Sequence, residues 1–192
     1  MTVKNPKNKG SAFERRVSKQ LSLWWSQGED DNIFWRSISS GAMATNRSKQ
    51  GKATNAAYGD ITYLEPSGEP LLRVFTFELK KYSSLDMMTL IDGKSTGLLG
   101  KFWEKLLKEC QEAKKAGWGA SPAMVTSRNN RIPLMTIDYK MYLKLTDYCG
   151  AVKESLPMVA IRQNGFVTQT IRLRDFLDWV DPMVIRTLHN TQ

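Results

Sequence analysis

An apolar run over residues 71–77 leads directly into Glu78, Leu79 and Lys80. Successive side chains of a strand point to opposite faces, so Glu78 and Lys80 share one face and Leu79 lies on the other. Burying a charge is costly unless the charge is paired or bound to a metal. The run therefore predicts a buried strand with an acid and an ammonium at its end, and it favours a divalent-metal site.

Length and hydropathy indicate one folded domain. The chain has 192 residues, of which 41% are hydrophobic, enough for a core. We expect a flexible basic arm over 1–10 and a single domain over 11–192, with a core over about 11–138 and a C-terminal extension over about 139–192. Apolar stretches fall short of the ~18 residues of a membrane span, so we expect no membrane partner.

The net charge and the small numbers of histidine and cysteine narrow the classes of function. With 28 Lys and Arg against 19 Asp and Glu, the net charge is +9, which favours a nucleic-acid partner. The single histidine, His189, argues against histidine-metal nucleases and Ser-His-Asp hydrolases. Cys110 and Cys149 have no zinc or disulfide spacing, so we expect reduced thiols and a cytoplasmic protein of a bacterial or phage-infected cell.

The order of predicted elements indicates an α/β domain, with a mixed central sheet flanked by helices. A long polar loop over 37–59 separates the first two strands, and its Arg47, Lys49 and Lys52 suit a nucleic-acid surface, although a merely mobile loop would read the same way. Helices are expected over 11–26, 98–116 and 173–180. Strands are expected over 33–35, as a hairpin over 58–64 and 71–80, over 123–127 and 134–138, and as a second hairpin over 158–162 and 166–171.

Asp60 and Glu78 lie on opposite arms of the first predicted hairpin, so folding can bring the two carboxylates together. Mg²⁺, for which Mn²⁺ can substitute, prefers such oxygen ligands, and the backbone carbonyl of Leu79 is a further candidate ligand. Lys80 supplies a cation that could orient or deprotonate a water and stabilise a pentacoordinate phosphate. These four residues therefore suit phosphodiester hydrolysis.

Glu14 has two interpretations. It lies at the edge of an apolar helical stripe that includes Phe13, Val17 and Leu21, from which it can reach over the sheet and hold metal-bound water or a second metal. It also lies three residues after Ser11, the spacing of a capping box at the start of a helix. A cap and a catalytic acid are both consistent with the sequence.

Gly59-Asp60 followed by Glu78-Leu79-Lys80 resembles the PD-(D/E)XK nuclease superfamily, with Gly59 where a proline is usual. The segments 9–16 (KGSAFERR), 34–36 (FWR) and 39–41 (SSG) resemble archaeal-type Holliday junction resolvases. The resemblance covers about residues 9–125, and phage nucleases of the superfamily share this layout. It implies a restriction-endonuclease-like core and Mg²⁺-dependent cleavage of DNA in recombination and repair by a homodimer, without a small-molecule cofactor.

The resemblance also implies roles for individual residues. Asp60, Glu78 and the Leu79 carbonyl would bind the metal, Lys80 would be the catalytic lysine, and Glu14 would be the helix-borne acid. Gln111 could reach the site from the next helix, or it could be an ordinary surface residue. The candidate DNA contacts are Lys9, Arg15, Arg36, Ser39, Ser40, Arg47, Lys49 and Lys52.

Two other functions stay open. A nuclease of the same fold could cut other DNA, in phage genome processing or in degradation of host DNA. A non-catalytic nucleic-acid-binding protein, in which the carboxylates are structural, would bind DNA in a salt-sensitive way without metal-dependent turnover.

Overall fold

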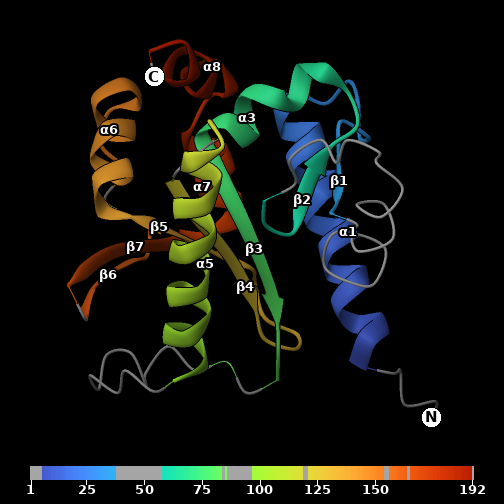
Figure 1. Cartoon of the computed structure of the whole chain (residues 1–192), viewed down its shortest axis with the longest axis vertical. Helices are drawn as coiled ribbons and strands as arrows, with labels where there is room; N and C mark the ends of the chain where they lie inside the picture. Colours follow the sequence, from blue (N-terminus) through green and yellow to red (C-terminus); the bar gives the residue numbers. More distant parts are fainter. Residues whose placement is uncertain are drawn as a thin grey trace.

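The computed structural model describes residues 6–37, 58–83, 85, 97–118, 121–153, 156–163 and 165–191. Within these residues a mixed five-stranded sheet has the order β3-β4-β5-β7-β6 (Figure 1). The β3–β4 pair is parallel and the other pairs are antiparallel. The strands are β3 (Phe75–Lys81), β4 (Ser121–Ser127), β5 (Leu134–Asp138), β6 (Met158–Gln163) and β7 (Phe166–Arg172).

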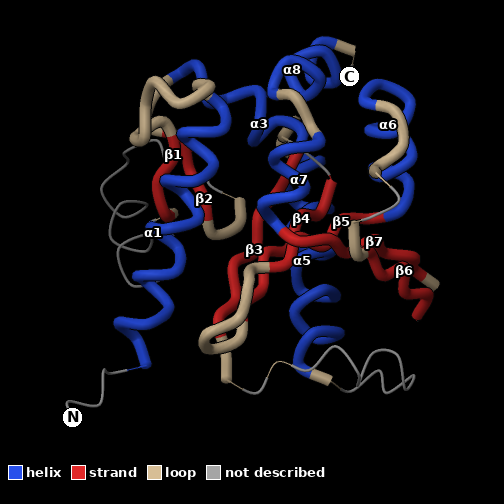
Figure 2. The backbone as a smooth tube through the Cα atoms, turned by 180° about the vertical axis from the view of Figure 1, so that it is seen from behind, coloured by secondary structure: helices blue, strands red, loops and turns tan. Residues whose placement is uncertain are grey.

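Helices cover both faces of this sheet, which confirms the predicted α/β class and is compatible with a restriction-endonuclease-like core. Leu79 and Val125 point into a large core shared with α1 and α7, whereas Met124 points into a smaller core shared with α5. Figures 1 and 2 show α5 and α7 on opposite faces. The helices in the described residues are α1 (Pro6–Trp25), α3 (Glu69–Val74), α5 (Leu98–Lys115), α6 (Tyr139–Cys149), α7 (Leu173–Trp179) and α8 (Pro182–Asn190).

The predicted hairpin over 58–80 is wrong. β2 (Ile61–Tyr63) pairs with β1 (Phe34–Arg36) instead, and the chain then forms a short 3₁₀ turn (Pro66–Gly68) and α3 before β3 begins. Pro70 suits the first turn of a helix, and Glu69 pairs with Arg73 one turn later at 2.8 Å. The first half of the apolar run is therefore helical, and a single parallel bridge between Gly59 and Phe77 joins the β2 segment to β3.

Helix α1 begins at Pro6, five residues before the expected start. Ser11 consequently lies inside the helix, so the capping-box interpretation of Glu14 is wrong, and residues 6–10 are helical rather than part of an arm. The apolar stripe is confirmed, since Phe13, Val17 and Leu21 are buried.

The remaining expected elements are confirmed within a residue or two: β1, α5, β4, β5, the β6–β7 hairpin and α7. Residues beyond 138 complete the sheet through β6 and β7 and pack against α1, where the Trp24 indole donates to the Val180 carbonyl at 2.9 Å. The sequence prediction missed α6 and α8. Each begins at an N-cap aspartate, Asp138 or Asp181.

Candidate active site

Asp60 is held against β3 by its own backbone and side chain. Its N–H donates to the Phe77 carbonyl at 2.7 Å, and its Oδ2 accepts from the Leu79 N–H at 2.8 Å. Gly59 makes this approach possible, because its φ is +80° and a Cβ there would lie 2.2 Å from the Phe77 carbonyl oxygen. A proline, with φ fixed near −65°, cannot adopt this backbone, which accounts for the departure from the superfamily pattern.

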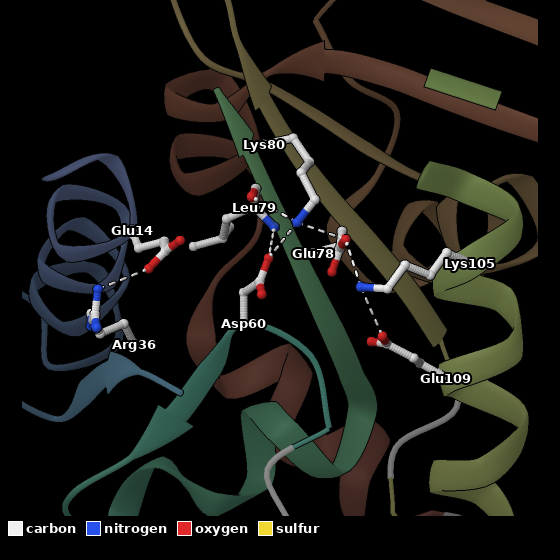
Figure 3. Close-up of polar contacts among 8 residues, drawn as sticks. All are labelled: Glu14, Arg36, Asp60, Glu78, Leu79, Lys80, Lys105 and Glu109. Carbon is white, nitrogen blue, oxygen red and sulfur yellow. Dashed lines mark hydrogen bonds and ion pairs between the residues drawn. The ribbon is translucent and has the colours of Figure 1, made fainter. Parts of the chain in front are cut away.

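Three oxygen atoms converge on the Lys80 ammonium (Figure 3). The distances from Nζ are 2.7 Å to Glu78 Oε1, 3.0 Å to Asp60 Oδ2 and 3.2 Å to the Leu79 carbonyl oxygen. Glu78 and Lys80 thus share a face of β3, as the strand alternation predicts. The parallel bridge between Gly59 and Phe77 brings Asp60 beside them. The predicted partners meet, although by a different chain path from the one expected.

Glu78 is a fully buried carboxylate with one oxygen left unsatisfied. Its exposure is 0%, and its Oε2 has no hydrogen-bond partner. Burial and the neighbouring Asp60 raise the pKa of Glu78. Because an unsatisfied buried carboxylate oxygen is costly, the site is suited to a further cation.

The oxygen set fits a hard divalent cation. Asp60, Glu78 and the Leu79 carbonyl offer the all-oxygen environment that Mg²⁺ prefers, and Mg²⁺ is commonly held by one or two carboxylates together with water. Among the described residues, no three His, Cys, Asp or Glu side chains gather into a metal-binding group. The fit therefore rests on two carboxylates and one carbonyl.

Lys80 keeps its proton in this environment. Burial alone would lower its pKa, but the carboxylates of Asp60 and Glu78 outweigh that effect and raise it. Of the two roles expected from the sequence, charge stabilisation fits this state better than proton abstraction from water.

Helix α5 adds two residues that the sequence prediction missed. Lys105 Nζ lies 3.2 Å from Glu78 Oε1 and 3.0 Å from Glu109 Oε1 (Figure 3). The i,i+4 spacing of Lys105 and Glu109 is the only sequence signal for this pair, and it is common on helix surfaces. Gln111 is exposed and lies about 200° around the helix from Glu109 at ~100° per residue, so α5 reaches the site through Lys105 rather than Gln111.

Glu14 approaches from α1 on the other side of Asp60 (Figure 3). Its Oε2 lies 3.4 Å from Arg36 Nη1. Burial and the charge of Asp60 raise the pKa of Glu14, while Arg36 and Lys80 oppose that rise. Arg36 therefore pairs with a carboxylate here. Glu14 borders the catalytic cluster, which we define as Asp60, Glu78, Leu79 and Lys80, but it is not one of the residues whose oxygens contact Lys80 Nζ.

The predicted DNA contacts are only partly within the described residues. Arg15 is exposed on α1, and Lys9 belongs to α1 but its side chain is not among those described. Ser39, Ser40, Arg47, Lys49 and Lys52 lie outside the described residues. Their roles stay predictions.

A sheet strand that carries Glu-x-Lys beside an aspartate, in a sheet flanked by helices, is the arrangement expected of the PD-(D/E)XK nuclease superfamily. The family described as "Phage putative PDDEXK endonuclease" matches residues 5–185. The chain belongs to this family of endonucleases, for which DNA is the implied substrate. Curated proteins and solved structures gave no significant match.

In the part of the chain that the structure describes, no helix combines the length and apolar character needed to cross a membrane.

Proposed function

We propose that the protein is a Mg²⁺-dependent endodeoxyribonuclease that hydrolyses phosphodiester bonds in branched DNA, including four-way junctions. One observation carries the proposal: Asp60 Oδ2, Glu78 Oε1 and the Leu79 carbonyl oxygen converge within 3.2 Å of a single cation, Lys80 Nζ. The same convergence of oxygens suits a divalent ion, and the unsatisfied Oε2 of Glu78 adds a further oxygen that can ligate the metal.

Each residue has a distinct task in this proposal. Asp60, Glu78 and the Leu79 carbonyl hold Mg²⁺, for which Mn²⁺ can substitute. The ion, when bound, lowers the pKa of a water and neutralises charge on the phosphate. Lys80, protonated because of its two carboxylate partners, orients the attacking water and stabilises the negative charge that develops on phosphorus oxygens.

Glu14 and Arg36 border the same cluster and extend it toward α1. With its raised pKa, Glu14 is suited to accept a hydrogen bond from a water of the metal site. DNA binding would displace Arg36 from Glu14 toward a backbone phosphate. Arg15, exposed on α1, would contact a neighbouring phosphate.

Branched DNA is the preferred substrate in this proposal because segments 9–16 and 34–36 resemble junction resolvases, and both segments supply residues at the cluster. Those enzymes act as dimers with one active site for each cut strand, so we propose a homodimer. The net charge of +9 supports binding to the closely spaced phosphates of such a substrate.

The test is a cleavage assay on a four-way junction, a flap and a linear duplex of matched sequence, with Mg²⁺, Mn²⁺ or EDTA. We expect wild-type protein to cut the junction fastest, and Asp60→Ala and Lys80→Ala to lose at least ~100-fold in rate. Lys108→Ala, an exposed lysine on α5, is the control and should cut like wild type.

The outcomes separate the alternatives. Cleavage of all three DNAs at similar rates supports a nuclease for genome processing or host-DNA degradation and refutes the junction preference. Tight, salt-sensitive binding without metal-dependent cleavage, or full activity in Asp60→Ala and Lys80→Ala, refutes the active site.

A further inference from the structure

The face of the sheet that carries the catalytic cluster continues beyond Lys80 as a row of cross-strand neighbours. Lys80 is opposite Thr126 on β4, Thr126 is opposite Leu134 on β5, and Leu134 is opposite Arg172 on β7. Directly opposite residues point to the same face of a sheet. This row therefore extends from the cluster across the face that α5 covers.

A cavity of about 580 Å³ lies along this row. Leu85, Leu99 and Leu134 give it an apolar wall, and Ile132, 51% exposed, stands at its rim. The volume is within the ~300–1,000 Å³ of ligand pockets. The cavity can therefore hold a largely apolar group of a ligand.

Arginines give the cavity its charge. Arg128, Arg131 and Arg172 line it, and no Asp or Glu is among the described residues that do. Arg172 is paired with Asp175 outside the lining, so Arg128 and Arg131, both exposed, supply the net positive charge. An apolar wall beside two arginines suits a ligand that combines a ring with a phosphate.

The β4–β5 turn holds Arg128 and Arg131 in place. The Ser127 hydroxyl lies 3.0 Å and 3.1 Å from the carbonyl oxygens of Arg128 and Arg131. The Ser127 carbonyl accepts from the Tyr82 N–H at 3.2 Å, which joins this turn to the chain just after Lys80 and β3. Figure 1 shows the turn beside the C-terminal end of β3. The backbone of both arginines is thus fixed relative to Asp60, Glu78 and Lys80, and their exposed side chains extend from it.

Tyr82, two residues after Lys80, adds an aromatic surface beside the β4–β5 turn. It is 44% exposed and packs on Phe102 of α5 with ring centroids 5.4 Å apart. Lys80 Nζ lies 5.7 Å from the centre of the Phe102 ring. Exposed aromatic rings beside basic side chains are how proteins bind unpaired nucleotides.

We propose that this cavity binds an unpaired nucleotide of the DNA substrate, with its base against Ile132 and Leu134 and its phosphates on Arg128 and Arg131. The proposal rests on the proposed nuclease function and deepens it. Bases stacked inside a duplex cannot enter such a cavity. At ~4.8 Å per strand and ~3.4 Å per stacked nucleotide, the cavity lies roughly one to three nucleotides from the phosphate at Lys80.

The test measures binding without cleavage, by fluorescence anisotropy in EDTA. The probes are a labelled 20-nucleotide single strand, the matched blunt duplex, and the duplex with a single-stranded flap. The test variant is Arg128→Gln/Arg131→Gln. The matched control is Lys114→Gln/Lys144→Gln, which removes two exposed charges near Ser121, at the opposite end of β4.

We expect the arginine variant to bind the single strand and the flap about 10-fold more weakly, with less than about 3-fold loss on the duplex. Its salt slope on the single strand should fall by about 1.4, at ~0.7 for each lost phosphate contact. The lysine control should leave both the affinity for single-stranded DNA and the salt slope unchanged. Unchanged single-strand binding, or equal losses on duplex and single strand, overturns the proposal.

A second variant tests the apolar wall without changing charge. Ile132→Ser should weaken single-strand binding roughly five-fold with an unchanged salt slope, whereas Met183→Ser, at a residue 57% exposed on α8, should not. Equal binding by both overturns the base-binding part. The nuclease function fails by a different result: wild type that binds these DNAs but cuts none with Mg²⁺.

Discussion

Replacing Gly59 with alanine tests how the chain positions Asp60. Gly59 has φ +80°, and an added Cβ would meet the Phe77 carbonyl oxygen at 2.2 Å and the Phe77 nitrogen at 3.0 Å. Both atoms belong to the backbone of β3, so neither can move without disturbing the strand. The Asp60 N–H bond to the same carbonyl, at 2.7 Å, would be lost or lengthened.

The expected change in the free energy of unfolding combines three effects. A non-glycine residue in the left-handed region costs about 1–2 kcal/mol, and overpacking against a rigid neighbour costs about 1–3 kcal/mol more. Alanine recovers about 0.4–1 kcal/mol by restricting the unfolded chain. We therefore expect Gly59→Ala to lower the free energy of unfolding by about 1–5 kcal/mol, most of it from the backbone clash.

Gly28→Ala is the matched control. Gly28 has φ +95°, but a Cβ there would have no atom within 4 Å, so only the backbone strain remains and the loss should stay below about 1.5 kcal/mol. Urea unfolding followed by tryptophan fluorescence measures both values. Equal losses for the two variants would refute the close approach of residue 59 to β3. We also expect Gly59→Ala to lose Mg²⁺-dependent cleavage and Gly28→Ala to keep it.

Three further predictions follow from the site and the core. Lys80→Met leaves two buried carboxylates without their shared cation, so urea unfolding in EDTA should show a loss of about 3 kcal/mol in the free energy of unfolding. Mg²⁺ should raise the stability of this variant more than that of wild type. An equal effect of Mg²⁺ on both proteins would contradict the cation site. Burial and Asp60 raise the pKa of Glu14 in the folded protein. The stability that comes from protonating Glu14 is therefore full below its unfolded pKa of about 4.3, and it is lost as pH rises through the folded pKa. Glu14→Gln should therefore stabilise the protein at pH 7 but not at pH 4 while cleavage falls about 10–100-fold, and destabilisation at pH 7 would count against this account. Burial raises the pKa of the Cys110 thiol to about 11, so iodoacetamide at pH 8 should alkylate Cys110 only in denaturant. Rapid labelling of Cys110 in the native protein, mapped by mass spectrometry, would show that this part of the core is open.

The short-range features of the site could be predicted from the sequence. Alternation along a strand places Glu78 and Lys80 on one face whatever the rest of the chain does, and the distance of 2.7 Å between their charged atoms bears this out. The apolar stripe of α5 is likewise local, because Leu99, Trp103 and Leu106 recur at helical spacing and are buried.

The path between Asp60 and Glu78 could not be predicted in the same way. A short apolar run does not distinguish a buried helix turn from a buried strand, and residues 71–77 contain the end of α3 and the start of β3. The cap-like pair Ser11 and Glu14 was misleading for a similar reason, since a four-residue pattern fits the interior of a helix as well as its start.

Lys105 shows the limit of local reasoning most clearly. It contacts Glu78, 27 positions away, because α5 crosses the face of the sheet at that point, and no spacing in the sequence encodes this crossing. The starts of α6 and α8 did carry a usable signal. Asp138 and Asp181 each accept a hydrogen bond from a backbone N–H of the following helix, and Pro182 suits the first turn of α8.

We propose that Asp60, Glu78 and the Leu79 carbonyl form a divalent-metal site. A titration with Mn²⁺, followed by the electron paramagnetic resonance signal of the free ion, tests it most directly. We expect wild type to bind at least one Mn²⁺ per chain, and Asp60→Asn and Glu78→Gln to bind it at least ~10-fold more weakly. Glu112→Gln, at an exposed acid of α5, should bind like wild type. The same affinity in all four proteins would contradict the claim.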